Sequence, residues 1–227
     1  MKTKIMVGVL ASTMVLMTAC ELKFNGKKIF DDKTETQEIE ISNIEEPKTE
    51  EIEKDNKHLE FKGIPINGSL KKFVTNMKSA GFKTVGSVSN GNAVLKGDFA
   101  GYKDCRLYVQ TIDGADIVST IVVQFPEYDR WEYLYENYTN LKEMLTQKYG
   151  KPHSAREEFQ GYISRTDDDK MWQVEEGECK YETEFRTEKG KIILWIEQGG
   201  YKSGSACLQY NDKINSGIVK QKAIDDL

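Results

Sequence analysis

The start of the chain constrains its folding most, because it decides which residues are left to fold. A basic start, residues 1–4, precedes an apolar run, residues 5–17, and small residues then lead to Cys20. A positive start, an apolar middle and a small-residue exit are the three parts of a secretion signal. The run is shorter than the ~20 apolar residues that a membrane-spanning helix needs. We therefore expect residues 1–19 to be a signal peptide that is removed on export.

The end of this leader also predicts an anchor. Met17-Thr18-Ala19-Cys20 resembles a lipobox, where lipoprotein signal peptidase cleaves before a lipid-modified cysteine, although leucine is usual at the place of Met17. The resemblance implies lipidation of Cys20 and an outer-membrane-anchored envelope protein, periplasmic or surface-exposed. Each buried CH₂ group adds about 0.8 kcal/mol, so several acyl chains attach stably. An ordinary signal peptide with a chance cysteine, or an uncleaved anchor, is the alternative.

Charge separates the next segment from the rest of the chain. Residues 31–57 hold eleven acids and four bases and few aromatic side chains. Such a composition buries too little apolar surface to offset the entropy lost on ordering. We expect residues 20–57 to be a lipidated cysteine followed by an acidic flexible tether. The alternation of Ile39 and Ile41 leaves open a short strand on another surface.

The folded domain is expected over residues 58–227, in two similar halves, 59–126 and 127–212, followed by a polar tail. In the first half, Ser69 is the expected N-cap of a helix that Gly81 ends. Turn residues such as Asn90-Gly91 and Asp113-Gly114 separate the strands that follow. We expect these strands near 82–88, 93–99, 105–112 and 117–125.

The second half repeats this order. Apolar residues three or four apart predict a helix over 129–149, which Gly150 and Pro152 end. Strands are expected near 178–186, 191–197 and 205–210, and a polar tail over 220–227. The order predicts an α+β fold: an antiparallel sheet with two main helices on one face, built from a pseudo-duplicated helix-plus-strands unit.

This element order is similar to that of beta-lactamase-inhibitor-protein-like domains and of small assembly lipoproteins of the outer membrane. A closer resemblance, to uncharacterised exported lipoproteins of Bacteroides-type bacteria, covers most of residues 59–227. It rests on GIP at 63–65, GDFAGYKDC at 97–105, LKEML at 141–145, KYGKP at 148–152 and YNDKIN at 210–215. The resemblance implies a lineage and a compartment but carries no known activity, so it transfers no functional residue.

The sequence contains no recognisable catalytic or metal-binding motif. The two histidines, His58 and His153, lack metal-ligand spacing, and the sequence has no Gly-x-Ser-x-Gly and no phosphate loop. The triplet 167–169 lacks the alternating spacing of a calcium loop and reads as a solvated turn. We expect no enzyme, no metal and no cofactor. A hydrolase of unknown type remains an alternative, because abundant carboxylates would supply a pair in many folds.

Three cysteines follow Cys20, and which of them form a disulfide is left open. Cys105 shares strand parity with Leu107, and Cys179 with Tyr181, so both are expected to pack in the core. Cys207 has the opposite parity from its apolar neighbours and is the expected exposed thiol. A bridge between Cys179 and Cys207 is disfavoured, because a strand between them would hold the backbones ~9.5 Å apart.

A binding role is the remaining expectation. If helices cover one side of the sheet, an aromatic and aliphatic patch would lie on the other, and such patches often mark interaction surfaces. Its predicted residues are Tyr108, Val118, Val122, Ile193 and Trp195. A nearly neutral domain without a basic stripe argues against nucleic acid. We expect a non-catalytic binding domain for a protein or a glycan, or alternatively an accessory subunit of an outer-membrane assembly complex; the oligomeric state stays open.

Overall fold

The computed structural model describes residues 23–24, 27–28, 57–86, 88, 90–161, 166–225 and 227. The chain forms two units, 1–44 and 45–227. In the first unit, β1 (Lys23–Phe24) pairs antiparallel with β2 (Lys27–Lys28), inside the segment expected to be a tether. The predictions for the signal peptide, Cys20, Ile39 and Ile41 lie outside the described residues. None of the helices in the described ranges has the length and apolar character required to span a bilayer.

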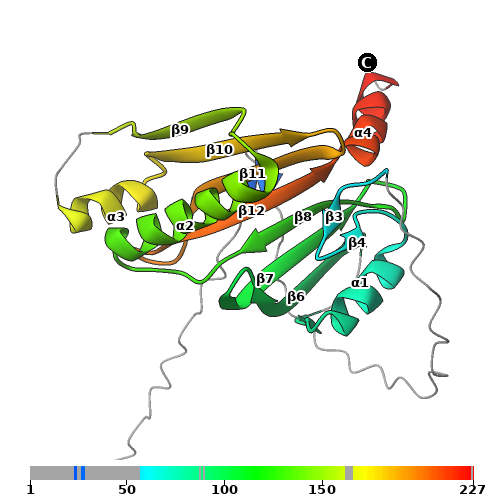
Figure 1. The fold of residues 1–227 in the computed structure, drawn as a ribbon, viewed down its shortest axis with the longest axis horizontal. Helices are drawn as coiled ribbons and strands as arrows, with labels where there is room; N and C mark the ends of the chain where they lie inside the picture. Colours follow the sequence, from blue (N-terminus) through cyan, green and yellow to red (C-terminus); the bar gives the residue numbers. More distant parts are fainter. Residues whose placement is uncertain are drawn as a thin grey trace, which may run out of the picture. The chain divides into compact units, whose positions relative to one another are not determined.

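The second unit is built on an eight-stranded antiparallel sheet with the strand order β5-β6-β7-β8-β12-β11-β10-β9 (Figure 1). The strands are β5 (Lys83–Thr84), β6 (Asn92–Phe99), β7 (Tyr102–Thr111), β8 (Val118–Gln124), β9 (Ser154–Phe159), β10 (Cys179–Thr187), β11 (Gly190–Gln198) and β12 (Gly204–Asp212). A small hairpin of β3 (Glu60–Phe61) and β4 (Ile64–Pro65) precedes the first helix.

Helices cover one face of this sheet. Helix α1 (Leu70–Ser79) contacts β5, β6 and β7, whereas α2 (Trp131–Tyr149) contacts β10, β11 and β12 (Figure 1). Apolar side chains of both helices and of the strands beneath them form one buried core cluster. The predicted α+β fold, with its two main helices on one face, is therefore confirmed. We call the other side of the sheet the opposite face.

The element order repeats about the middle of the sheet. One half runs α1, β5, β6, β7, β8, and the other runs α2, β9, β10, β11, β12. The last strands of the two halves, β8 and β12, pair antiparallel at the centre, so each half extends outward in the same order. The pseudo-duplicated unit expected from the sequence is present. Helix α3 (Asp167–Glu175) is an addition within the second half.

Two helices occur where none was expected. The triplet 167–169 is not a solvated turn but the first turn of α3: the Thr166 hydroxyl accepts a hydrogen bond from Asp169 N, and the acidic side chains favour a helix N-terminus. Likewise, the expected polar tail is the end of α4 (Lys213–Asp225). The apolar residues of α4 do not recur on one side, so hydrophobic periodicity does not reveal it.

Candidate functional site

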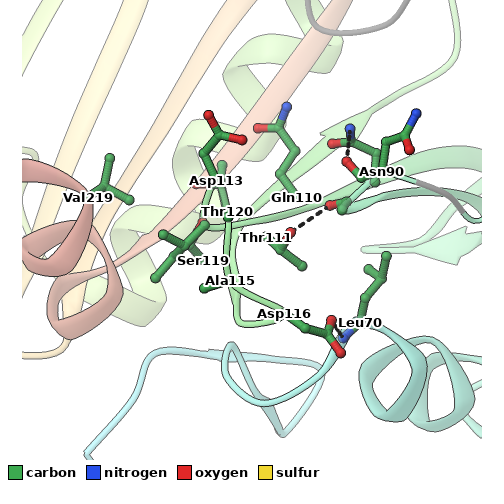
Figure 2. Close-up of a pocket in the computed structure, with 14 residues that line it drawn as sticks. Leu70, Asn90, Gln110, Thr111, Asp113, Ala115, Asp116, Ser119, Thr120 and Val219 are labelled. Carbon is green, nitrogen blue, oxygen red and sulfur yellow. Dashed lines mark hydrogen bonds between the residues drawn. The ribbon is translucent and has the colours of Figure 1, made fainter. Parts of the chain in front are cut away.

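A pocket of about 870 Å³ lies at one end of β6, β7 and β8 (Figure 2). Leu70, the first residue of α1, lines it on one side, and Val219 of α4 lines it on another. The turns before β6 and between β7 and β8 supply most of the remaining wall. These other lining residues are Asn90, Gly91, Asn92, Gln110, Thr111, Ile112, Asp113, Gly114, Ala115, Asp116, Ser119 and Thr120.

The turn at Gly91 holds one wall in place. Both Thr111 N and Thr111 Oγ1 donate hydrogen bonds to Gly91 O, over 2.8 and 3.1 Å. Gly91 has a φ of +75°, and a Cβ at this position would lie 2.3 Å from Thr111 Oγ1. Only glycine therefore satisfies both the left-handed backbone and the close approach of the two strands.

A change of register shapes the floor of the pocket. Gln110 pairs with Thr120, but the next pair is Thr111 with Val118, so β8 carries one extra residue there. The extra residue is Ser119, whose side chain lines the pocket. Bulges of this kind redirect side chains at sheet edges and next to binding sites.

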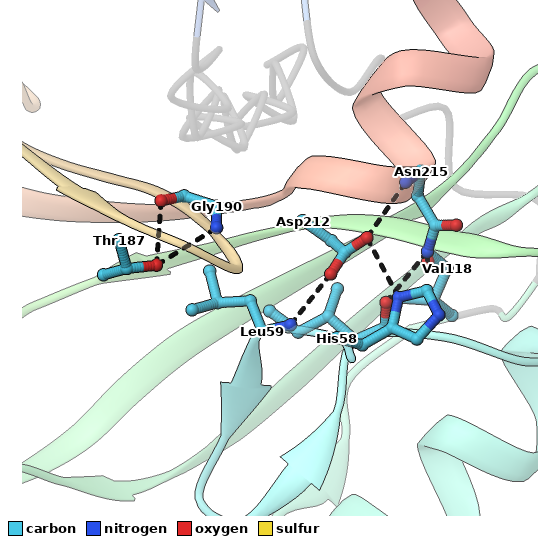
Figure 3. Close-up of polar contacts among 8 residues, drawn as sticks. His58, Leu59, Val118, Thr187, Gly190, Asp212 and Asn215 are labelled. Carbon is cyan, nitrogen blue, oxygen red and sulfur yellow. Dashed lines mark hydrogen bonds and ion pairs between the residues drawn. The ribbon is translucent and has the colours of Figure 1, made fainter. Parts of the chain in front are cut away.

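Helix α4 is fixed as a wall by a buried polar junction (Figure 3). Asp212 Oδ1 accepts a hydrogen bond from Asn215 N over 2.9 Å, which caps the start of α4. Asn215 Nδ2 donates to the carbonyl oxygens of Ile66 and Val118, over 2.9 and 2.8 Å. Further along α4, Lys222 Nζ donates to Asp113 O over 2.8 Å. Both ends of the helix are thereby tied to the β7–β8 region.

The lining is rich in hydrogen-bonding groups of both kinds. It holds three amides, three hydroxyls and two carboxylates, and no Lys, Arg or His stands among the fourteen described lining residues. Asp116 Oδ1 is already occupied, since it accepts a hydrogen bond from Leu70 N over 2.8 Å. Within the described part of the chain, Gln110, Ser119 and Thr120 make no side-chain hydrogen bond. These three groups are therefore available to a ligand.

The polar row continues across the sheet beyond the pocket. On the opposite face, Asn92 pairs with Gln110, Gln110 with Thr120, and Thr120 with Asn211. Asn211 is 8% exposed, and its Nδ2 has no hydrogen-bond partner among the described residues. Its Oδ1 accepts a bond from Gln209 Nε2 over 2.6 Å, while Gln209 Oε1 also lacks a described partner. Buried polar groups without a hydrogen-bond partner in the protein commonly bond to a water molecule or a ligand.

The structure places four of the five predicted binding residues on the opposite face. Tyr108, Val122 and Ile193 lie in one register row, with Gln209 between the last two, and Trp195 belongs to the next row. They are less accessible than a surface patch, because the exposed fractions of Tyr108, Val122 and Ile193 are only 7%, 2% and 7%.

Val118 does not join them. It is fully buried within the core cluster, on the helix side of the sheet. Strict alternation along β8 predicts the opposite face for Val118, but the register change between Gln110 and Thr111 breaks the alternation.

Polar groups near the predicted patch hydrogen-bond to one another. Tyr108 Oη donates a hydrogen bond to Gln124 Oε1 over 3.0 Å.

The three cysteines in the described part of the chain are buried or half-buried and do not supply a reactive thiol. Burial raises the pKa of Cys105 to about 11 and that of Cys179 to about 12, so both thiols are protonated at neutral pH. The expectation that Cys207 is exposed is wrong: it is fully buried on the central strand β12, with Gln124 and Trp195 opposite it on the two neighbouring strands. None of the three described cysteines is in a disulfide, and β11 lies between β10 and β12 as expected.

The histidines also lie apart from any reactive cluster. His58 is buried with its Nδ1 3.0 Å from Asp212 Oδ1, in the junction at the start of α4, and His153 is exposed before β9. In the described ranges, no group of three or more His, Cys, Asp or Glu side chains is placed to hold a metal ion. The best-formed candidate site is therefore the pocket beside α4.

Sequence reasoning missed the pocket, although two of its parts were visible. In the sequence, the turns Asn90-Gly91 and Asp113-Gly114 indicate only breaks between strands. Their convergence depends on the register of β6 and β7 and on α4, which the pattern did not predict. Comparisons of the chain with protein-family models, with curated proteins and with solved structures gave no match.

Proposed function

We propose that the protein is a lipid-anchored envelope protein whose folded domain binds a partner molecule without transforming it. The pocket beside α4 carries this proposal: it is large enough for a small ligand or for a segment of a larger one, and its lining offers many hydrogen bonds. Cys20 would hold the domain at the membrane surface, at the root of the acidic segment.

Several observations favour binding over catalysis. The fourteen described residues that line the pocket include no histidine, cysteine or lysine that would serve as a base or a nucleophile. Its two carboxylates are Asp113 and Asp116, of which Asp116 is engaged with the backbone of α1. The two thiols with raised pKa values, Cys105 and Cys179, pack in or against the core cluster rather than in the pocket.

Crosslinking in the native envelope tests this proposal. A photo-reactive amino acid would replace Asp113, which is exposed at the pocket, and in a second strain Met144, which is exposed on α2. We expect a specific product at the position of Asp113 and none at that of Met144, identified by mass spectrometry as protein or carbohydrate. Equal products at both positions, or none at either, would contradict binding through the pocket.

A further inference from the structure

The chemistry of the pocket limits the classes of ligand that it can bind. The inference about that ligand rests on the proposed binding function. No basic side chain stands among the described residues that line the pocket, so a phosphate, a nucleotide or an acidic glycan would find no charge partner among them. Lys222 Nζ donates to Asp113 O over 2.8 Å, but Lys222 is not among the residues that line the pocket. A bare divalent cation is also poorly served, because Asp116 is committed to Leu70 N and calcium takes six to eight oxygen ligands.

Neutral hydroxyl groups fit the lining better. A sugar hydroxyl both donates and accepts, and so do the side chains of Gln110, Ser119 and Thr120, which keep their hydrogen-bonding capacity within the described chain. Val219, whose side chain is 45% exposed, adds apolar surface to the same pocket. A pyranose ring needs both kinds of contact, because its hydroxyl edges are polar and its C–H faces are apolar.

The arrangement of the polar side chains favours a chain of sugars over a single one. Asn92, Gln110, Thr120 and Asn211 follow one another across β6, β7, β8 and β12. Neighbouring strands are ~4.8 Å apart, so the row extends over roughly 14 Å. At its end, Asn211 Nδ2 is a buried donor without a described partner, which a ligand hydroxyl would satisfy.

We propose that this pocket and the row of amide and hydroxyl side chains bind a neutral oligosaccharide. Its hydroxyl groups exchange hydrogen bonds with Gln110, Ser119 and Thr120, and its C–H faces contact Val219. Asn211 lies beyond the residues that line the pocket and continues the polar row toward the centre of the sheet. The ligand lies along the row rather than across it, since the donors and acceptors repeat from strand to strand.

The test uses the full mature, lipidated chain in detergent and a panel of neutral oligosaccharides cut from mannan, xylan, β-glucan and galactan. Binding is measured by saturation-transfer NMR and titration calorimetry, with sialylated and sulfated oligosaccharides as the charged comparison. We expect at least one neutral oligosaccharide to bind, and Gln110→Ala and Thr120→Val each to weaken it about tenfold. Gln147→Ala, a matched change on the exposed side of α2, should leave the affinity within about twofold.

The possible results distinguish this inference from the proposed binding function. Unfolding by urea shows whether the variants keep their stability, and Thr120→Val keeps the shape of the side chain while removing its hydroxyl. Absence of binding by every neutral saccharide, or unchanged affinity in Gln110→Ala and Thr120→Val, overturns this inference. If the pocket then still crosslinks to a protein in the envelope, the proposed binding function stands without it. Cleavage of a bound saccharide overturns both.

Discussion

The backbone N–H of Leu59 donates a hydrogen bond of 2.8 Å to the Asp212 carboxylate, across 153 residues of sequence (Figure 3). The same carboxylate accepts from Asn215 N and lies 3.0 Å from His58 Nδ1. One fully buried side chain thus joins the residues before β3 to the end of β12 and the start of α4. Since α4 forms a wall of the pocket, this junction also determines the shape of the candidate site.

Replacing the Asp212 carboxylate should destabilise the domain. In Asp212→Asn, an amide stands where two oxygens now accept from Leu59 N and Asn215 N, so one buried donor loses its partner. We expect the free energy of unfolding in urea to fall by about 2 kcal/mol. Asp129→Asn, the same change at an exposed position, should shift it by less than about 0.5 kcal/mol. Equal shifts in the two variants would show that the junction contributes little.

Two glycine variants separate backbone strain from steric conflict at the pocket. Gly91 and Gly101 both have positive φ, +75° and +84°, but only Gly91 faces a close neighbour, Thr111 Oγ1. Gly101→Ala should lower the free energy of unfolding by about 1 kcal/mol. Gly91→Ala should lower it clearly further and weaken ligand binding. If thermal unfolding gave the same loss for both, the contact between Gly91 and Thr111 would not be a constraint.

Alkaline pH should destabilise the fold through its buried thiols. Burial raises the pKa of Cys105 and Cys179 from 9.0 to about 11 and about 12, so the folded state keeps a proton that the unfolded state releases. Their contribution is complete below pH 9 and is lost as the pH rises toward 11–12. We expect unfolding free energies to fall more steeply above pH 9 in the wild type than in Cys105→Ala and Cys179→Ala. Parallel pH profiles would argue against buried, protonated thiols.

Lipidation is tested separately from the folded domain. Cys20→Ser should leave the precursor unprocessed by lipoprotein signal peptidase and unlabelled by radioactive fatty acid, because the acyl chains attach to the cysteine itself. Cys207→Ser is the matched control and should be processed and labelled as the wild type is. Fatty-acid labelling that survives in Cys20→Ser would place the anchor elsewhere in the chain.

The sequence predicts the architecture well where local patterns and tertiary packing agree. The helix over 131–149 has one apolar stripe and ends at Gly150, so its existence and its buried side follow from spacing alone. The strands expected near 178–186 and 191–197 likewise form an antiparallel pair, β10 and β11, joined by a tight turn at 187–190. Strand parity likewise identifies the core side of β7, where Leu107 and Val109 are fully buried.

The candidate site escaped prediction for physical reasons. Parity assumes strict alternation, and the bulge between Gln110 and Thr111 moved Val118 to the core and placed Ser119 in the pocket. Parity also does not say what surrounds a side chain on the opposite face. Cys207 is buried there, with Gln124 and Trp195 opposite it on the two neighbouring strands. The N-cap Asp212 of helix α4 is a local signal, but no apolar stripe follows it. The long-range contacts of α4, such as that from Asn215 Nδ2 to Val118 O, are contained in no local pattern.

The pocket is proposed to hold a neutral oligosaccharide and to release it chemically unchanged. The most direct measurement incubates the panel of neutral oligosaccharides overnight with the mature chain. Mass spectrometry then analyses both the saccharides bound to the protein and those that remain unbound. We expect a saccharide of unaltered mass bound to the wild-type protein, and we expect it to be absent from the fraction bound to Gln110→Ala. A shortened or hydrated product, or no saccharide retained by the wild type, would contradict it.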